Sequence, residues 1–389
     1  MSKNMTLTIL LTNIFIAFLG IGLVIPVLPT IMNELHLSGA MVGNLVAAFA
    51  IVQLIVSPIA GRWVDQFGRK RMIVIGLIIF SFSELLFGLG MTVNVLFISR
   101  MLGGVSAAFI MPAVTAFIAD ITTVETRSKS MGYMSAAIST GFIVGPGVGG
   151  FLAEIGTRLP FFAAATVAMI SAIASLLLLQ EPKRQKAAMV QEKHNGLKRT
   201  FNPLYVYAFA IIFISSFGLA AFDSLFSLFV DRKFGFTPKD IAIIITGGAI
   251  VGAISQVILF DGLTRFLGEI KLIRYCFIVS GILVFVTTQV NTYAGILIAT
   301  IFVFVGFDLM RPAFTGYLSK VAGNEQGFVS GMNSMFTSVG NVFGPMVGGF
   351  LFDIHFDYPF YFAAIAMVIG IVITLFWKKP QASELPPTV

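Results

Sequence analysis

The sequence has few charged residues. Only 11% of its 389 residues are Asp, Glu, Lys or Arg, whereas 57% are hydrophobic. A soluble globular domain carries roughly 25% charged residues. A chain of this composition has far more apolar surface than a water-soluble globule can bury. The composition therefore excludes a soluble protein, and we expect lipid to surround most of the chain.

Residues that build disulfides, metal sites and nucleotide sites are also scarce. The lone Cys276 excludes an internal disulfide, and no Cys and His residues have the spacing of metal ligands. The histidines, His36, His194 and His355, all fall in predicted loops. The chain lacks a Gly-x-x-x-x-Gly-Lys-[Ser/Thr] sequence, which argues against ATP binding. We therefore expect no cofactor and no metal, and carboxylates as the groups that titrate inside the membrane.

Long apolar runs fill most of the chain. A membrane-spanning helix needs about 20 consecutive apolar residues, and the run from Leu7 to Met32 carries no charge at all. This first run is too long and too rich in proline for a signal peptide. The runs predict an all-α integral membrane protein with twelve helices, at residues 7–32, 40–61, 72–90, 94–119, 131–154, 158–180, 204–230, 240–260, 272–290, 293–318, 327–352 and 358–377.

The loops between these helices differ in charge. If both termini are cytoplasmic, the Lys and Arg residues of the loops gather on the cytoplasmic side, and only Arg158, Arg232, Lys233 and Lys239 fall outside. Positively charged loops stay on the cytoplasmic side of a bilayer. The distribution predicts cytoplasmic termini, and it explains the net charge of +7 without a nucleic-acid partner.

The chain consists of two similar halves. MPAVTAF (Met111 to Phe117) resembles RPAFTGY (Arg311 to Tyr317), and GFIVGPGVGGFL (Gly141 to Leu152) resembles GNVFGPMVGGFL (Gly340 to Leu351). Equivalent predicted helices follow in the same order and sense, as in a parallel duplication. The longest polar stretch separates them. We predict an N-terminal six-helix bundle (1–180), a cytoplasmic linker (181–203) and a C-terminal six-helix bundle (204–389).

Both copies of the glycine-rich segment contain proline. Small residues let helix backbones approach closely in lipid, and a proline bends a helix. We interpret the matched pair as thin, bent helices at an interface where the halves rock against each other; ordinary close packing is the alternative. The residues concerned are Gly141, Gly145, Pro146, Gly149, Gly150, Gly344 and Pro345.

Four motifs give the chain a resemblance to a known family over its whole length. They are LGIGLVIPVLP (Leu19 to Pro29), GRWVDQFGRKR (Gly61 to Arg71), LFISRMLGGVSAA (Leu96 to Ala108) and the GFIVGPGVGGFL segment. With them the chain resembles the major facilitator superfamily and its twelve-helix drug:proton antiporters, most closely the Bmr/NorA group of bacterial multidrug efflux pumps. The resemblance implies a monomeric multi-pass protein of the bacterial cell membrane, driven by a proton gradient.

A few charged side chains lie inside the predicted helices. Each costs at least roughly 2.5–3.5 kcal/mol at the bilayer centre unless it is paired or faces a cavity. They are Glu84, Arg100, Asp223, Asp308 and Arg311. Arg311 lies one turn after Asp308, where its charge favours the ionised carboxylate while burial favours the neutral one. The alternatives are a permanent ion pair for Asp308 and an inert protonated acid for Asp223.

The resemblance assigns roles to most of these residues. It implies that Asp223 and Asp308 form the proton-coupling site, in which we include Arg311, and that Arg100 takes part in proton transfer. Glu84 matches no motif, and packing and a relay role are both open. Near the cytoplasmic face, Asp65, Arg69 and Asp120 suggest a latch that opens and closes, with Gly61 and Gly68 in the same motif.

Phenylalanine dominates the aromatic residues, with 40 Phe against 8 Tyr and 2 Trp. Most of these rings must face lipid or pack. Phe222 and Phe226 lie close to Asp223, and Phe304 lies one turn before Asp308. Aromatic faces beside a buried anion attract lipophilic cations without fixing their shape. The resemblance adds four cavity positions, Phe18, Gln53, Phe142 and Asn341.

These observations together predict a proton-driven efflux antiporter that exports lipophilic cationic drugs and dyes by alternating access, and not an enzyme. Three alternatives are open: a proton-coupled metabolite symporter, an exporter of one specific solute, and a non-transporting receptor or lipid-handling protein. The complete antiporter motif argues against import, and the duplicated bundles with acids inside the membrane argue against a receptor. The scarcity of polar side chains in the helices argues against a sugar or peptide carrier.

Overall fold

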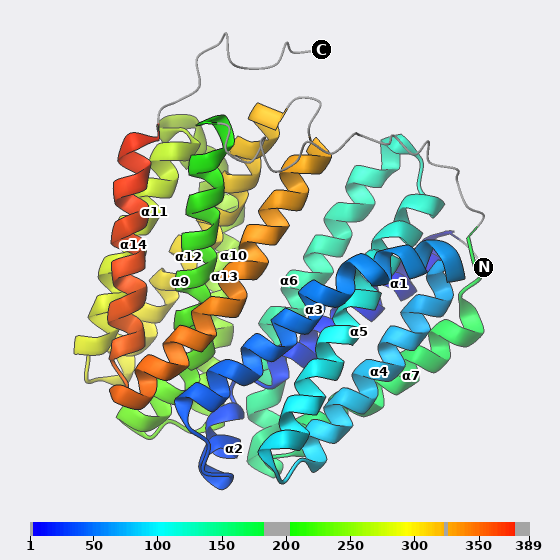
Figure 1. Cartoon of the computed structure of the whole chain (residues 1–389), viewed down its shortest axis with the longest axis horizontal. Helices are drawn as coiled ribbons and strands as arrows, with labels where there is room; N and C mark the ends of the chain where they lie inside the picture. Colours follow the sequence, from blue (N-terminus) through cyan, green and yellow to red (C-terminus); the bar gives the residue numbers. More distant parts are fainter. Residues whose placement is uncertain (1–2, 183–202, 323–325, 378–389) are drawn as a thin grey trace. The chain divides into compact units, whose positions relative to one another are not determined.

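The computed structural model describes residues 3–182, 203–322 and 326–377, and all regular structure in these ranges is helical (Figure 1). The helices are α1 (Lys3–Leu23), α2 (Leu28–Glu34), α3 (Gly39–Phe67), α4 (Arg69–Leu89), α5 (Val93–Ile121), α6 (Val124–Ile155), α7 (Leu159–Leu178), α9 (Pro203–Phe234), α10 (Pro238–Leu267), α11 (Glu269–Gln289), α12 (Tyr293–Ala322), α13 (Gln326–Ile354) and α14 (Tyr358–Phe376). In the described part, 12 helices are long and apolar enough to cross a membrane, which confirms the predicted number.

The first predicted helix, 7–32, was wrong at its C-terminal end. α1 ends at Leu23, a turn follows, and the short α2 begins at Leu28. Pro26 lies in this turn and cannot donate a backbone hydrogen bond, so it interrupts the helix. Pro29 lies in the first turn of α2, where the missing donor has no helical partner to lose.

The described residues divide into two compact units. Unit 1 takes its residues from Met1–Leu37, Leu45–Met189 and Phe236–Thr246, and unit 2 from Ser38–Asn44, Val190–Gly235 and Gly247–Val389. The predicted linker, 181–203, lies almost entirely outside the described residues. The predicted domain boundaries and the cytoplasmic position of the termini stay predictions.

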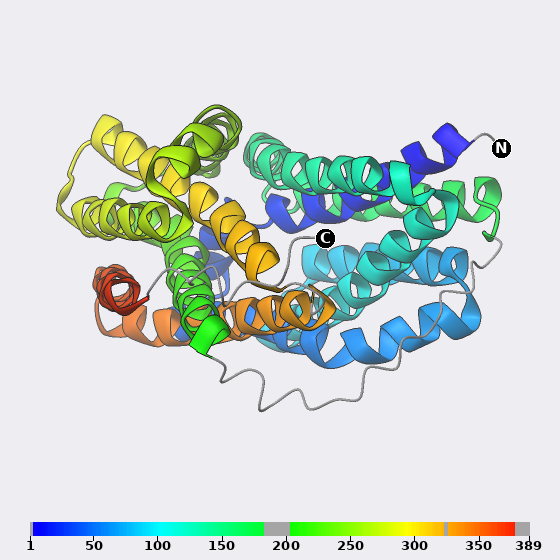
Figure 2. The ribbon, with the colours of Figure 1, turned by 90° about the horizontal axis from the view of Figure 1, so that it is seen from above.

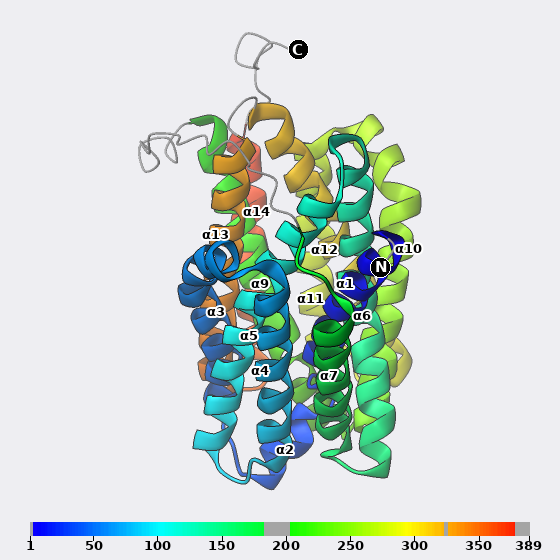
Figure 3. The ribbon, with the colours of Figure 1, turned by 90° about the vertical axis from the view of Figure 1, so that its right-hand side faces the viewer.

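The same helix pairs pack together in both units. In unit 1, α1 packs against α6, and α4 packs against both α5 and α7 (Figures 2 and 3). In unit 2, α9 packs against α13, and α11 packs against both α12 and α14. The equivalent helices are in the same chain order, as a parallel duplication requires.

Side-chain hydrogen bonds join the buried faces of unit 1. The Asn13 amide of α1 donates to the Ser175 hydroxyl at 2.9 Å and accepts from Ser171 at 2.6 Å, which ties α1 to α7. Ser83 and Ser99 each donate to the backbone carbonyl of the other, at 2.7 and 2.8 Å, which ties α4 to α5. In lipid the hydrophobic effect does not drive helices together, so hydrogen bonds of this kind contribute to helix association.

Candidate functional site

Two glycines of α10 make room for the acid of α12. A Cβ atom added at Gly252 would overlap the Asp308 carboxylate, and one added at Gly248 would lie 2.6 Å from the Phe304 ring. Gly248 and Gly252 are one turn apart, as are Phe304 and Asp308, so both pairs lie on matching helix faces. Asp308 thus lies directly against the backbone of α10. The sequence analysis missed this glycine pair, although the four-residue spacing that the two glycines share with Phe304 and Asp308 could have indicated it.

The helices that carry the two candidate coupling acids are neighbours in unit 2. The rings of Phe222 in α9 and Phe304 in α12 meet edge to face with 6.3 Å between centroids. Phe222 directly precedes Asp223, and Phe304 lies one turn before Asp308. Both acids are partly exposed, and neither accepts a hydrogen bond from the described residues.

Arg311 does not close an ion pair with Asp308 in this conformation. Arg311 is exposed, and among the described residues no oppositely charged atoms of the two side chains come within 4.0 Å. The permanent ion pair, which was the alternative for Asp308, is therefore not formed here.

The aromatic residues near Asp223 belong to the packed core of unit 2. Phe222, Phe226 and Phe229 are 0% exposed. The Phe222 ring lies 5.3 Å from Phe226 and 5.6 Å from Phe360, and Phe229 lies 4.3 Å from Phe360. Direct contact of Phe222 or Phe226 with a substrate requires this cluster to rearrange, whereas Phe304 is partly exposed already.

The other predicted cavity positions are distributed over four helices. In unit 1, Phe18 of α1 and Phe142 of α6 meet edge to face at 4.9 Å, and Phe142 remains 39% exposed. Gln53 of α3 is partly buried, and its carbonyl accepts a hydrogen bond from Ser57 at 2.6 Å. Asn341 of α13, in unit 2, is exposed.

Arg100 and Glu84 are brought together in unit 1. The Arg100 guanidinium donates to the Glu84 carboxylate at 3.2 Å, and both residues are buried. The two residues lie at similar distances from the turn that joins α4 to α5, so the antiparallel hairpin makes them neighbours. A similar distance from a short turn was the signal that could have paired them in the sequence.

The predicted latch residues meet at the junction of α3 and α4. Arg69 makes contacts of 3.0 Å with Asp65 and 2.9 Å with Asp120, so α3, α4 and α5 join at one guanidinium. Gly68 precedes it with a φ of 104°, a left-handed conformation that favours glycine. Gly61 is only partly buried and has open space around it.

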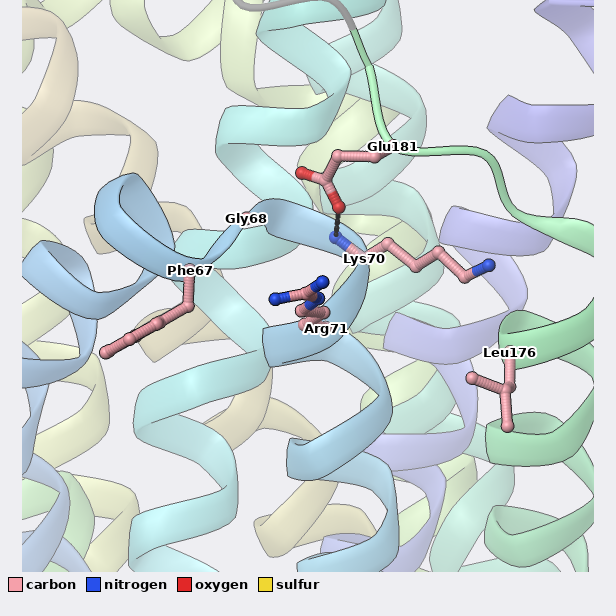
Figure 4. Close-up of a pocket in the computed structure, with 6 residues that line it drawn as sticks. All are labelled: Phe67, Gly68, Lys70, Arg71, Leu176 and Glu181. Carbon is pink, nitrogen blue, oxygen red and sulfur yellow. Dashed lines mark hydrogen bonds between the residues drawn. The ribbon is translucent and has the colours of Figure 1, made fainter.

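A residue that the sequence analysis missed completes this junction. The Glu181 carboxylate accepts a hydrogen bond from the backbone N–H group of Lys70 at 3.0 Å (Figure 4). It accepts a second one from the backbone N–H group of Arg69 at 2.5 Å. It therefore caps the N-terminus of α4, where a negative charge is favoured. Glu181 follows α7 and lies far from Arg69 in sequence, so no local pattern indicates it. A pocket of about 430 Å³ opens beside it, lined by Phe67, Gly68, Lys70, Arg71, Leu176 and Glu181.

The proline-containing glycine helices pack against the first helix of their half. Cβ atoms added at Gly141, Gly145 and Gly149 would lie 2.8, 2.6 and 2.5 Å from three carbonyl oxygens of α1 that are one helical turn apart. In unit 2, Cβ atoms added at Gly340 and Gly344 would lie 3.0 and 2.6 Å from carbonyl oxygens of α9. These close backbone contacts explain why both copies have glycine at every fourth residue.

Gly150 lies on another face of α6. Its added Cβ would lie 2.5 Å from the carbonyl oxygen of Pro238 and would overlap Ala242, both in the segment of α10 that belongs to unit 1. Pro146 and Pro345 lie inside α6 and α13. The role of these residues in movement stays a prediction.

Comparison with known families agrees with this architecture. The profile described as "Major Facilitator Superfamily" matches residues 10–332, and it matches again over 208–389. The chain belongs to the Major Facilitator Superfamily. It is accordingly a transporter and not an enzyme, and with 12 helices able to span a membrane it is a multi-pass protein of the bacterial cell membrane.

Relatives within this superfamily come from bacteria. The chain is 70% identical to "Multidrug resistance protein 1" of Bacillus subtilis (strain 168), over 97% of each chain. It is 56% identical to "Multidrug resistance protein 2" of the same strain, over 96% of this chain and 95% of the relative. It is 43% identical to "Quinolone resistance protein NorA" of Staphylococcus aureus (strain COL), over 97% and 98%. The predicted place in the Bmr/NorA group is confirmed.

Solved structures of other proteins share the major facilitator fold. One is a bacterial homologue of the human lysosomal transporter Spinster, with a TM-score of 0.87 and 16% sequence identity over 100% of this chain and 99% of that one. Another is the nucleoside transporter NupG, with a TM-score of 0.72 and 16% identity over 97% of this chain and 98% of that one. At such identities the similarity concerns the fold alone.

Proposed function

We propose that this transporter exports chemically varied, lipophilic and mostly cationic compounds in exchange for protons. The observation that carries the proposal is the 70% identity to a protein named for multidrug resistance, which extends over 97% of both chains. The relative named for quinolone resistance supports the same class of cargo. The scarcity of polar side chains in the helices favours a site that binds by apolar and Coulomb attraction.

The proposed coupling uses Asp223 and Asp308 for both ligands. Each carboxylate attracts a cation when it is ionised and loses that attraction when a proton neutralises it. A drug enters from the cytoplasm or the inner leaflet while the acids are ionised. Protons from outside then neutralise the acids and permit return to the inward-facing state. Proton and drug compete for the same groups, so one gradient drives the other uphill.

Three observations support this assignment. Asp308 is partly exposed and has no hydrogen-bond partner among the described residues, so a bound proton displaces no structural bond. Gly252 leaves room for the carboxylate against the backbone of α10. Phe304 and the Phe18–Phe142 pair offer aromatic faces that attract cations.

The remaining parts of the cycle follow from the duplicated fold. We propose that the two halves alternate access to a central site, that Asp65, Arg69 and Asp120 form a latch near the cytoplasmic face, and that the glycine-rich α6 and α13 adjust during the movement. The proton gradient is the energy source, no cofactor takes part, and the protein works as a monomer.

Ethidium efflux tests the proposed function. Energised cells that express the transporter should extrude ethidium against its gradient, and an uncoupler should abolish the extrusion. Everted vesicles separate export from import, because an energised exporter accumulates the dye inside them. Efflux that survives full collapse of the proton gradient would contradict the proton coupling, and accumulation of the dye by intact cells would contradict the direction of transport.

A further inference from the structure

Glu84 is a buried carboxylate to which the proposed transport cycle gives no task. It lies within α4, and 1% of its surface is exposed. A carboxylate at this position in a membrane protein is costly unless an opposite charge and hydrogen bonds balance it. The groups around Glu84 therefore show how far its negative charge is compensated.

Arg100 balances Glu84 through a single contact. One terminal guanidinium nitrogen of Arg100 lies 3.2 Å from one Glu84 oxygen. The other carboxylate oxygen and the Nε atom of Arg100 are both buried without a hydrogen bond to any described residue. The guanidinium also lies 4.3 Å from the centroid of the Phe87 ring. Arginine and a carboxylate can form two parallel hydrogen bonds, so this pair is only half satisfied.

Neutral hydrogen bonds beside the pair also join its two helices. Ser83 and Ser99 are the sequence neighbours of Glu84 and Arg100, and they exchange hydrogen bonds of 2.7 and 2.8 Å between α4 and α5. Ser106 adds a bond to the Gly76 carbonyl at 2.8 Å. These neutral bonds join α4 and α5 without using the charge of Glu84.

Among the described residues, Arg100 is the charged group in contact with Glu84. Arg158, which precedes α7, donates to the Gly88 and Gly90 carbonyls one turn further along and pairs with Glu34. Helix α4 packs against α5, α7 and α1. Helix α7 contains no ionisable residue, and α1 contains only Lys3 at its first position. On α5 the other charged residue is Asp120, which is paired with Arg69. The basic residues of α4 lie in its first turn, about 20 Å along the helix from Glu84 at 1.5 Å per residue.

We propose that Glu84 is a proton-exchange residue of the transporter in addition to Asp223 and Asp308, one that holds Arg100 in place while ionised and releases it when protonated. The proton of the coupled gradient adds to the unpaired oxygen of Glu84, and no other bond is made or broken. The attraction to Arg100 then falls, and the guanidinium is no longer held at Glu84. Glu84 thus acts through Arg100 as a positioning residue. The proposal rests on the proposed proton coupling.

Isotope-edited infrared spectroscopy of the purified wild-type protein tests this directly. The proposed coupling acids of unit 2 are aspartates, so carboxyl-labelling of glutamate alone separates Glu84 from them. We expect a labelled carboxylic-acid band that changes with pH and upon addition of tetraphenylphosphonium, and that is lost in Glu84→Gln. A wild-type protein whose labelled glutamates show no such band, or whose band persists unchanged in Glu84→Gln, overturns the proposal.

Proton release provides a second measurement. Addition of tetraphenylphosphonium to the weakly buffered protein should release fewer protons from Glu84→Gln than from the wild type, and Glu84→Asp should restore part of the release. Ser99→Ala is the matched control, because it loosens the same helix contact without removing a titratable group, and its proton count should equal that of the wild type. Equal release from Glu84→Gln and the wild type overturns the role of Glu84. Absence of release from the wild type contradicts the proton coupling itself.

Discussion

At the scale of single residues, Asp308 shows how an acid is accommodated in a membrane span without a permanent counter-ion. Arg311 lies one turn away and stays exposed, while the glycine of the neighbouring helix provides the space. In this conformation the Asp308 carboxylate is positioned by packing against α10 and not by a hydrogen bond to a described residue. A group held in this way can exchange one cation for another without breaking the structure around it.

Removing the charge of either acid should abolish uphill efflux. We expect Asp308→Asn and Asp223→Asn each to lose efflux of every substrate, because a neutral amide binds neither proton nor cation. Neither acid makes a hydrogen bond to the described residues, so the variants should fold and insert normally. Efflux of several dyes from energised cells is the measurement. Asp261→Asn, the same change at an exposed site, is the control. Wild-type efflux in both variants would show that coupling lies elsewhere.

Exposed and buried phenylalanines should respond differently to truncation. Loss of one aromatic face removes roughly 0.5–2 kcal/mol of cation–π attraction, so Phe142→Ala and Phe304→Ala should change the affinity for some drugs several-fold and leave others unaffected. Phe226 is 0% exposed, and Phe226→Ala should instead lower stability, by about 3–5 kcal/mol if it behaves as in soluble cores.

The measurement for these variants is a panel of unrelated cationic dyes and antibiotics, together with a thermal unfolding curve for each. Phe266→Ala, at a ring that is 87% exposed, is the control and should change neither. Uniform loss across the panel for Phe142→Ala and Phe304→Ala, with unchanged unfolding, would argue for one rigid binding site and against a permissive one.

At the scale of helices, two kinds of glycine contact have different consequences. Gly141, Gly145 and Gly149 of α6 lie against backbone carbonyls of α1, and a backbone cannot turn away. Gly252 lies against the end of the Asp308 side chain, and this side chain can rotate away from an added group. A methyl group added at the first kind of site should separate two helices, whereas one added at the second should move a single carboxylate.

Gly145→Ala should therefore destabilise the α1–α6 pair, and Gly145→Leu should do so more strongly. The added Cβ would lie 2.6 Å from the Leu19 carbonyl oxygen, and overpacking of this kind typically costs roughly 1–3 kcal/mol. Thermal unfolding in detergent and ethidium efflux are the measurements, and both should decrease. Gly132→Ala in the same helix meets open space and is the control. Normal stability and transport in Gly145→Leu would show that the glycine row is dispensable.

Gly252→Ala should separate stability from coupling. The new methyl group displaces the Asp308 carboxylate, while alanine improves helix propensity by up to about 1 kcal/mol. We expect an unfolding temperature equal to or above that of the wild type and a loss of proton-driven efflux. Gly247→Ala, which meets open space in the same helix, should keep both. If Gly252→Ala transports at the wild-type rate, the position of Asp308 against α10 has no part in coupling.

At the scale of the whole molecule, the chain offers a direct test of its predicted orientation. Its single cysteine, Cys276, is 6% exposed and should react slowly with a membrane-impermeant maleimide. Exposed Thr92 lies in a loop predicted to face outward, and exposed Thr123 in one predicted to face the cytoplasm. We expect Thr92→Cys to be labelled in intact cells and Thr123→Cys only after the membrane is opened. The reverse pattern would contradict the positive-inside assignment.

Features carried by one helix could be predicted from the sequence, and features shared between distant segments could not. Apolar length located the 12 spans, and the glycine spacing in α6 indicated a close neighbour. The identity of that neighbour, α1, depends on tertiary packing. Glu181 was missed because its hydrogen bonds are made by backbone groups, which leave no trace in residue type. The full burial of Phe226 was also hidden, since lipid-facing and core phenylalanines are equally apolar.

The contact between Gly252 and Asp308 limits how an equivalent acid could be introduced into the N-terminal half by mutation. The position in unit 1 that corresponds to Asp308 is Ala108, which is 1% exposed, and α3 has Val52 where α10 has Gly252. Ala108→Asp alone would force a carboxylate into a filled contact. Val52→Gly alone would leave a void. An acid at the equivalent site of the N-terminal half, with a glycine opposite it, therefore requires both substitutions together.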